Sequence, residues 1–382
     1  MECILHIGTE KTGSSTLQHF LSLNRSRLLK KGIAYTKTLG KKVNNGICLL
    51  SYPIERRDNL TEKIKVVSDT DFRQKQQKLK KRFKKEIKNI VKIRGVKKFI
   101  ISSELIQSRL ITEKDVQKLK TLLVDELGFD KIKVVIYLRD PALTAQSLFS
   151  TAIKFGHTGE GPPHPNDEYF GNVCNHKATL KRFGNIFGED SLVIRLFQKE
   201  DLFGNSIITD FFHVLKEPIS PRYIVPKNSN PSLSYTAVSL LSEINKYWPR
   251  KIGNHPNYKR SYLIKYLENN STTKFKISTQ LKREYDKYFN KSNEWVRKKY
   301  FPHRETLFYK SNINNNFEYQ QNFNIEEVAN LVTQIWKKQY KTSIKEMLKI
   351  SARSLREKCR LWISILQLKI RNYRKKFKNL WI

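Results

Sequence analysis

The feature that most constrains this fold is a strand, a glycine-rich loop and a helix at the start of the chain. The segment reads ECILHIGTEKTGSSTLQHFL, an apolar run followed by Gly8 and Gly13 and then by the polar beginning of a helix. In such a loop, backbone N–H groups and the positive end of the helix dipole favour an anion. The sequence therefore predicts an anion-binding loop over Gly8–Thr16.

Ser14 separates this loop from those of nucleoside triphosphatases. The Walker pattern requires lysine directly after the second glycine, where it reaches the β- and γ-phosphates of the nucleotide. Here that position holds Ser14, and the lysine of the loop is Lys11, which precedes Gly13. We therefore expect a ligand whose anionic groups are arranged differently from those of ATP.

Apolar strands alternate with helical segments up to about Ser232. Strand-like runs at 97–104, 131–141 and 191–197 are separated by segments with helical spacing of apolar residues, including the lysine-rich 71–95. This alternation predicts an α/β fold in three layers, a mostly parallel sheet with helices on both faces. Beyond Ser232 the pattern is mainly helical.

The positive charge of the chain favours anionic ligands but does not identify which one binds. The chain has 73 Lys and Arg against 35 Asp and Glu, a formal net charge of +38. Nucleotides, nucleic acid, acidic glycans and anionic lipid all suit such a protein. No nucleic-acid-binding module is recognisable, so no nucleic-acid partner is expected. The four cysteines have neither disulfide nor metal-ligand spacing, and no metal is expected.

A second candidate site follows the strand 131–141. Arg139 stands at the carboxyl end of this strand, and Ser147 comes about two turns into the next helix, which we expect over 142–156. Sheets of this class bind ligands at the carboxyl ends of their strands, and a guanidinium offers forked, permanently charged donors to phosphate. The fold is therefore expected to hold two anionic groups, one at each motif.

Four motifs together, GTEKTGSST, IISSE, YLRDPALTAQS and KNSNPSLS, resemble those of the PAPS-dependent sulfotransferases, particularly the bacterial carbohydrate-type members. The resemblance extends from about Ile4 to Phe308. It implies a sulfotransferase domain over 1–310 with a P-loop-like fold, whose first loop binds 3′-phosphoadenosine 5′-phosphosulfate (PAPS), the co-substrate. The implied reaction moves the sulfuryl group to a hydroxyl of a carbohydrate or glycolipid acceptor, without a metal. PAPS has no γ-phosphate, so a Walker lysine would have nothing to contact.

The same resemblance implies roles for individual residues. Lys11 contacts the bridging oxygen of PAPS and assists the leaving phosphate, while Arg139 with Ser147 binds the 3′-phosphate. Lys227 begins the segment that in the family returns toward the cofactor. The implied PAPS contacts lie in the loop, at a strand end and downstream: Lys11, Thr12, Gly13, Ser14, Ser15, Thr16, Arg139, Ser147 and Lys227.

The general base that takes the proton of the acceptor is expected to be Glu104, since IISSE places this carboxylate just past a strand end. In the alternative interpretation, Glu104 caps or ion-pairs a neighbouring helix. The fallback bases are His157 and His164 in the Gly- and Pro-rich segment 157–172, which we expect to be a long functional loop. His6, inside the first strand, is expected to be a core or supporting group.

Residues 311–382 are predicted to form a helical, basic C-terminal extension. From Lys341 onward, Lys and Arg are interleaved with Leu, Ile, Trp and Phe. Two interpretations stay open: a helix packed on the domain with a solvated face, or one that docks to anionic lipid or an acidic partner. The first strand begins at once and no run of about 18 apolar residues occurs. We therefore expect a cytoplasmic protein, with peripheral contact at the inner membrane face through this extension.

Two other functions compete with sulfuryl transfer. A P-loop kinase or nucleotide phosphotransferase would need lysine after Gly13 and an acidic Mg²⁺ ligand at a strand end, a role that Glu104 or Asp140 meets only loosely. A non-enzymatic polyanion-binding protein is compatible with the charge but shows no recognisable module. Competition between 3′,5′-ADP and duplex DNA for binding separates these functions.

Overall fold

The computed structural model describes residues 1–226, 232–253, 255–271, 274–309 and 325–336. The chain divides into two compact units, each made of two stretches of sequence. The first comprises Met1–Ser232 with Lys274–Gln321, and the second comprises Leu233–Thr273 with Asn322–Ile382. The first unit contains the anion loop together with Glu104 and Arg139.

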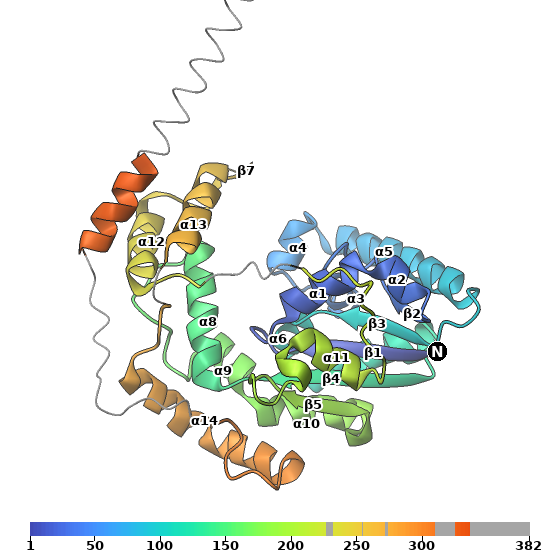
Figure 1. Cartoon of the computed structure of the whole chain (residues 1–382). Helices are drawn as coiled ribbons and strands as arrows, with labels where there is room; N and C mark the ends of the chain where they lie inside the picture. Colours follow the sequence, from blue (N-terminus) through green and yellow to red (C-terminus); the bar gives the residue numbers. More distant parts are fainter. Residues whose placement is uncertain (227–231, 254, 272–273, 310–324, 337–382) are drawn as a thin grey trace, which may run out of the picture. The chain divides into compact units, whose positions relative to one another are not determined.

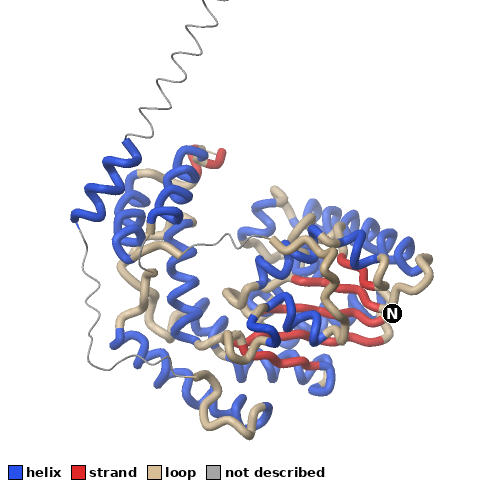
Figure 2. Tube along the Cα trace, viewed as in Figure 1, coloured by secondary structure: helices blue, strands red, loops and turns tan. Residues whose placement is uncertain are grey.

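A five-stranded sheet forms the centre of the first unit (Figures 1 and 2). All neighbouring strands are parallel, in the order β2-β3-β1-β4-β5. The strands are β1 (Glu2–Gly8), β2 (Ile33–Tyr35), β3 (Lys98–Ser102), β4 (Lys131–Leu138) and β5 (Leu192–Leu196). Because β1 lies between β3 and β4, the segments that follow these three strands meet at one edge, where α/β sheets bind ligands.

Side chains that alternate along β1 enter opposite cores, as expected for a strand buried on both faces. Leu5 and Ile7 belong to the larger core, whereas Ile4 belongs to a second core on the other face. Helices cover both faces, so the unit has three layers, and the predicted fold class is confirmed.

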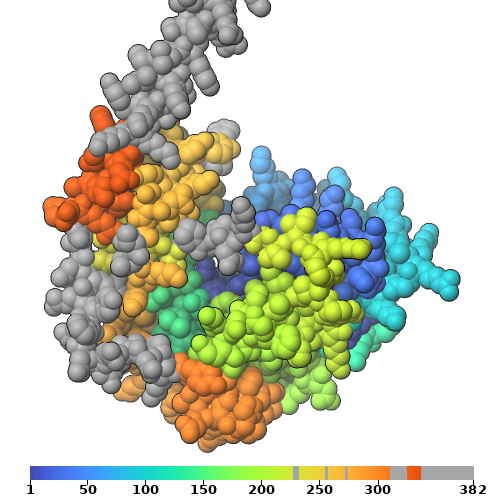
Figure 3. All heavy atoms as spheres, in the orientation of Figure 1, coloured from blue at the N-terminus to red at the C-terminus, as the bar shows by residue number. Residues whose placement is uncertain are grey.

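Three helices contribute to the second core: α1 (Ser14–Leu23), α2 (Arg25–Leu29) and α11 (Ile207–Val214). α1 and α11 lie side by side and are visible as blue and yellow-green atoms in Figure 3. The larger core contains side chains from α3 (Gly46–Ser51), α4 (Asn59–Lys63), α5 (Asp69–Val91), α6 (Leu105–Arg109), α7 (Glu113–Thr121), α10 (His176–Phe187) and α14 (Thr279–Tyr300). Single-turn segments are η1 (Leu122–Glu126), η2 (Glu189–Ser191) and η3 (Phe203–Asn205).

The helix after β4 begins and ends as its sequence dictates. α8 (Pro141–Lys154) has Pro141 at its first position, and the Asp140 carboxylate accepts a hydrogen bond from Leu143 N (2.9 Å) as its N-cap. It ends before Gly156, which has φ 101°. The helix predicted over 142–156 is therefore confirmed, apart from its exact bounds.

One local expectation needs correction, and one strand was not predicted. The segment 157–172 is not a loop throughout, because α9 (Glu168–Cys174) begins inside it. Asp167 caps this helix by accepting from Phe170 N at 2.9 Å, and Asp at an N-cap is a start signal that the Gly- and Pro-rich composition obscured. The short strand β2 was not predicted either, since three apolar residues carry no periodicity.

The second unit is mainly helical, as the pattern beyond Ser232 predicts. It contains α12 (Tyr235–Tyr247), α13 (Tyr258–Asn270), a helix over 325–336 and a small antiparallel pair, β6 (Lys251–Ile252) with β7 (His255–Pro256). Ser234 caps α12 and donates to Glu327 Oε1 (2.8 Å), which joins the two stretches of this unit. Most of the predicted extension 311–382 lies outside the described residues, and the boundary at 310 stays a prediction.

No helix among the described residues is long and apolar enough to cross a membrane. Cys3, Cys48 and Cys174 are free and buried, and Cys359 lies outside the described residues.

Candidate active site

The anion loop turns sharply between β1 and α1. Lys11 and Gly13 both have left-handed backbone, with φ of 67° and 75°, a conformation that costs little for glycine and more for lysine. Thr9 anchors the loop to β4, because its N and Oγ1 both donate to the carbonyl of Tyr137 (2.9 and 3.1 Å). Thr12 Oγ1 donates to Thr9 O (2.6 Å). These bonds hold the loop in one conformation.

The beginning of α1 is open to an anion. No side chain caps this helix, so its first N–H groups keep no side-chain partner. Ser14 Oγ is buried and makes no hydrogen bond within the described part of the chain. Thr16 N bonds to Gly13 O (3.0 Å) as part of the first turn, and Ser15 is exposed. A buried hydroxyl without a partner is costly, and an anion at this helix end would supply one.

Lys11 extends from the loop toward α8. Its Nζ donates to Thr151 Oγ1 (2.7 Å), and Thr151 in turn donates to the carbonyl of Ser147 (2.9 Å). Lys11 is half-buried and makes no ion pair with any described residue. Burial lowers the pKa of Lys11; the neighbouring Arg139 also lowers it, while Glu10 opposes this shift. An anion bound beside Lys11 would stabilise the charged ammonium.

Arg139, which directly follows β4, contacts the same loop. Its Nη1 donates to the carbonyl of Lys11 (2.9 Å), and its guanidinium carbon lies 5.9 Å from the ring centroid of Phe197. The carbonyl of Arg139 accepts from His176 Nε2 (2.8 Å), which fixes the strand end. Arg139 likewise has no ion pair within the described ranges. The structure thus brings Arg139 onto the loop, and Ser147 is linked to Lys11 through Thr151.

Glu104 lies against the start of the loop. It is the second residue after β3, and Gly8 is at the end of the neighbouring β1. A Cβ atom built on Gly8 would lie 2.8 Å from Glu104 Cβ, and Gly8 has φ +84°. Both the close approach and the backbone angle therefore require glycine at this position.

The Glu104 side chain is held by an amide and not by a helix end. Gln18 Nε2 donates to Glu104 Oε2 (2.7 Å), and α6, which begins at Leu105, has no side-chain cap. Glu104 forms no ion pair with a described residue either, so the alternative interpretation as a cap or salt bridge does not hold in this structure. Burial raises the pKa of Glu104, and the hydrogen bond from Gln18 opposes that rise. A raised pKa suits a general base.

The remaining candidates have other surroundings. His6 is buried, bonds to Ser102 Oγ (2.7 Å) and has its pKa lowered by burial to about 3, as expected for a neutral core group. His157 and His164 are exposed, and His164 Nε2 lies 3.2 Å from Glu284 Oε2. Lys227 lies outside the described residues.

Three residues of this site were missed by sequence reasoning. Gln18 holds Glu104, Thr151 accepts from Lys11, and Glu10 accepts from Tyr169 Oη (2.6 Å). Gln18 follows Ser14 by one helical turn, and Thr151 follows Ser147 by one turn, so helical spacing from residues already singled out was the available signal.

We call residues Gly8–Thr16 with Glu104 and Arg139 the loop edge.

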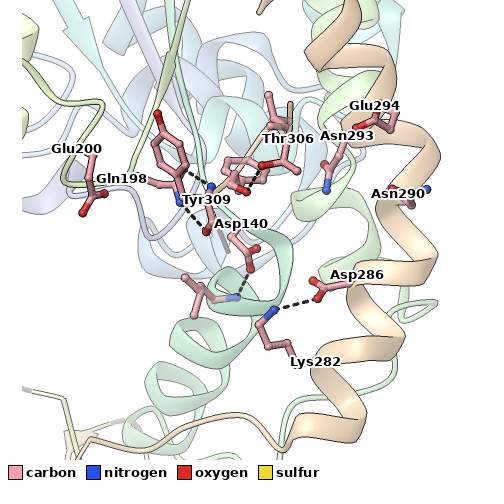
Figure 4. A pocket seen from close by; sticks show the side chains of 13 residues that line it. Asp140, Gln198, Glu200, Lys282, Asp286, Asn290, Asn293, Glu294, Thr306 and Tyr309 are labelled. Atoms are coloured by element: carbon pink, nitrogen blue, oxygen red, sulfur yellow. Dashed lines mark hydrogen bonds and ion pairs between the residues drawn. The ribbon is translucent and has the colours of Figure 1, made fainter. Parts of the chain in front are cut away.

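A hollow of about 770 Å³ lies near the carboxyl ends of β4 and β5 (Figure 4). Among the described residues that line it, the carboxylates are Asp140, Glu200, Asp286 and Glu294, and the basic residue is Lys282. Lys282 Nζ lies 2.9 Å from Asp286 Oδ2, so this cation is already paired. We call this space the acidic hollow; its charge disfavours a phosphate ligand.

Among the described residues, no three His, Cys, Asp or Glu side chains gather closely enough to hold a metal ion.

No protein-family model matches the chain. No curated protein matches its sequence. One solved structure that is similar is a sulfotransferase from Alicyclobacillus acidocaldarius, with 17% sequence identity and a TM-score of 0.37, covering 60% of this chain and 86% of that one. A likeness this distant does not indicate what this chain binds or transfers.

Proposed function

We propose that this protein transfers a sulfuryl group from PAPS to an acceptor hydroxyl. The observation that carries the proposal is the meeting of Lys11, Arg139 and Glu104 around the open beginning of α1. The two cations keep their charge available because neither has an ion pair among the described residues. An anionic donor and a hydroxyl that must lose a proton would use all three groups.

The residues fit the two anionic ends of PAPS. The first N–H groups of α1, with the unpartnered Ser14 hydroxyl, offer donors to the 5′-phosphosulfate. Arg139 offers its guanidinium to the 3′-phosphate, and Ser147 lies on the helix that follows it. The motif resemblance supports the same division of roles.

In the proposed reaction, the acceptor oxygen forms a bond to sulfur while the bond from sulfur to the phosphate oxygen breaks. Glu104 takes the proton of the acceptor hydroxyl, and 3′,5′-ADP leaves with the electron pair of the broken bond. Lys11 stabilises the negative charge that develops on the leaving oxygen. Charge stabilisation of this kind in a site shielded from water contributes several kcal/mol to a group transfer.

We propose a carbohydrate or glycolipid as the acceptor, on the motif resemblance, and no nucleic-acid partner. We also propose that the enzyme acts in the cytoplasm, where the basic segment 341–382 holds it at the inner membrane face. Deleting 341–382 should abolish binding to vesicles of anionic lipid in sedimentation assays. Unchanged vesicle binding would contradict this membrane role.

The direct test of the proposed function is calorimetric titration with 3′,5′-ADP, with ATP–Mg²⁺ as the comparison ligand. We expect dissociation constants of roughly micromolar order for 3′,5′-ADP, as two phosphate contacts to charged groups provide. ATP–Mg²⁺ should bind much more weakly, since Ser14 and not lysine directly follows Gly13. A preference for ATP–Mg²⁺ would overturn the proposal in favour of a kinase.

A further inference from the structure

We infer that Gln18 is a positioning residue for Glu104, orienting one carboxylate oxygen so that the other faces the acceptor hydroxyl. This inference rests on the proposed function, in which Glu104 is the general base. Nothing in the sequence motifs singles out Gln18, which lies on α1 one turn beyond Ser14.

The contact between Gln18 and Glu104 is partly buried and short. Gln18 is fully buried, and its Nε2 lies 2.7 Å from Glu104 Oε2. A carboxylate oxygen only accepts hydrogen bonds, so the amide must present its NH₂ group to Glu104. The remaining amide oxygen, Gln18 Oε1, is buried without a partner among the described residues. This orientation leaves the amide oxygen unpaired, and the hydrogen bond to Glu104 offsets that cost.

Two elements hold Glu104 from different sides. Gly8, at the end of β1, approaches the Glu104 backbone so closely that no Cβ atom fits between them. Gln18, on α1, fixes the carboxyl group itself. β1 and α1 are also the elements that flank the anion loop. The same two elements therefore position both the base and the anion site. This matters because a base must be aligned closely with the reacting atom.

An amide is the suitable partner for a general base. A lysine or arginine in place of Gln18 would pair with the carboxylate and lower its pKa strongly, which weakens a base. A neutral N–H donor orients one oxygen and leaves the carboxylate charge uncompensated. Other groups whose charge acts on Glu104 or is acted on by it come from the loop, β2 and α3: Glu10, Lys11, Tyr35 and Cys48.

The test compares Gln18→Leu with Gln76→Leu. Gln76, on α5, donates from its Nε2 to the carbonyls of Leu49 (2.7 Å) and Tyr52 (3.1 Å), so the control loses amide hydrogen bonds to residues outside the loop edge. The titration of the Glu104 carboxyl carbon is followed by NMR in protein labelled with ¹³C-glutamate, with the signal assigned by Glu104→Gln. The Glu104 pKa should rise in Gln18→Leu, which loses a donor to the charged form, and stay unchanged in Gln76→Leu.

Turnover provides the second measurement. In Gln18→Leu the acidic limb of the pH–rate profile should move to higher pH, and turnover at the optimum should fall by about 10- to 100-fold as the base loses alignment. If Gln18→Leu does not fold, Gln18→Glu serves instead: two adjacent carboxyls share a proton, so the acidic limb should again move to higher pH. An unchanged Glu104 titration and an unchanged acidic limb would overturn the role of Gln18. Absence of any PAPS turnover in the unmodified protein would instead overturn the proposed function. The two failures can be told apart because the NMR titration requires no turnover.

Discussion

The loop edge and the acidic hollow are adjacent in sequence but differ in whether their cations are paired. Arg139 donates to the carbonyl of Lys11 at the loop edge, whereas the next residue, Asp140, lines the acidic hollow. Lys11 and Arg139 make no ion pair with described residues, while Lys282 in the hollow is paired with Asp286. The net charge of +38 therefore does not locate the anion site. What locates it is the meeting of Lys11 and Arg139 at the uncapped beginning of α1.

The carboxyl groups of the two regions differ in the same way. Burial raises the pKa of both Glu104 and Asp140. The Glu104 carboxylate accepts a hydrogen bond from the side chain of Gln18 and caps no helix. The Asp140 carboxylate accepts a hydrogen bond from Leu143 N and caps α8. One carboxyl is thus available for chemistry, and the other is used to begin a helix.

Exchanging each of these carboxyls for an amide should separate the regions most strongly. Glu104→Gln removes the proposed base, and turnover should fall by about 10²- to 10⁴-fold. Asp140→Asn keeps a good N-cap and should leave turnover unchanged. Initial rates of sulfuryl transfer from labelled PAPS measure both variants. Full activity in Glu104→Gln would remove this residue from the mechanism.

Neutralising one lysine in each region gives the next largest effect. Lys11→Met should lower turnover by roughly 10²- to 10³-fold, because it removes a charge that stabilises the leaving oxygen. Lys282→Met, in the acidic hollow, is the matched control and should retain normal turnover. Circular dichroism should show both variants folded. Equal losses in the two variants would mean that the loop edge has no special role.

Adding a methyl group tests the geometry of the loop edge. Gly8→Ala forces a contact with Glu104 and a left-handed angle on alanine, whereas Gly95→Ala, with φ +91°, meets no atom within 4 Å. Gly95→Ala should cost about 1 kcal/mol in free energy of unfolding for the backbone angle alone. Gly8→Ala should cost more and should also lower turnover. Similar unfolding free energies in urea for both variants would contradict the close approach of Gly8 to Glu104.

The smallest predicted effect is a pH dependence of stability. A carboxyl whose pKa is raised on folding stabilises the protein below its unfolded pKa, and this contribution is lost as pH rises through the folded pKa. Glu104→Gln should therefore gain unfolding free energy relative to the unmodified protein as pH rises from acidic to neutral. Asp71→Asn is the control of opposite sign, because the bonds from Lys75 and Val67 N lower the pKa of Asp71. A pH-independent difference for Glu104→Gln would contradict the raised pKa.

Local sequence predicted the parts of the site that a single segment builds. Gly8, Gly13 and Ser14 stand in one strand, loop and helix, so their spacing alone indicated an anion loop. The strand ends that place Glu104 and Arg139 followed from apolar, β-branched runs. Parallel strands then put both residues at one edge of the sheet.

Pairings between distant segments could not be predicted in this way. The bond between Gln18 and Glu104 spans 86 residues of sequence, and that between Lys11 and Thr151 spans 140. Both depend on how α1 packs on the sheet and on how α8 lies beside Lys11, which no local pattern encodes. The capped start of α9 was missed for a different reason, because Asp167 stands in a segment dominated by Gly and Pro.

The measurement that tests the account most directly is a binding cycle at Arg139. Dissociation constants of 3′,5′-ADP and 5′-AMP are determined by calorimetry for the unmodified protein and for Arg139→Met. The account predicts that the 3′-phosphate tightens binding by about 10- to 100-fold in the unmodified protein, and that Arg139→Met loses most of this ratio. The same ratio in both proteins would show that Arg139 does not bind the 3′-phosphate, and the assignment of the loop edge to PAPS would be contradicted.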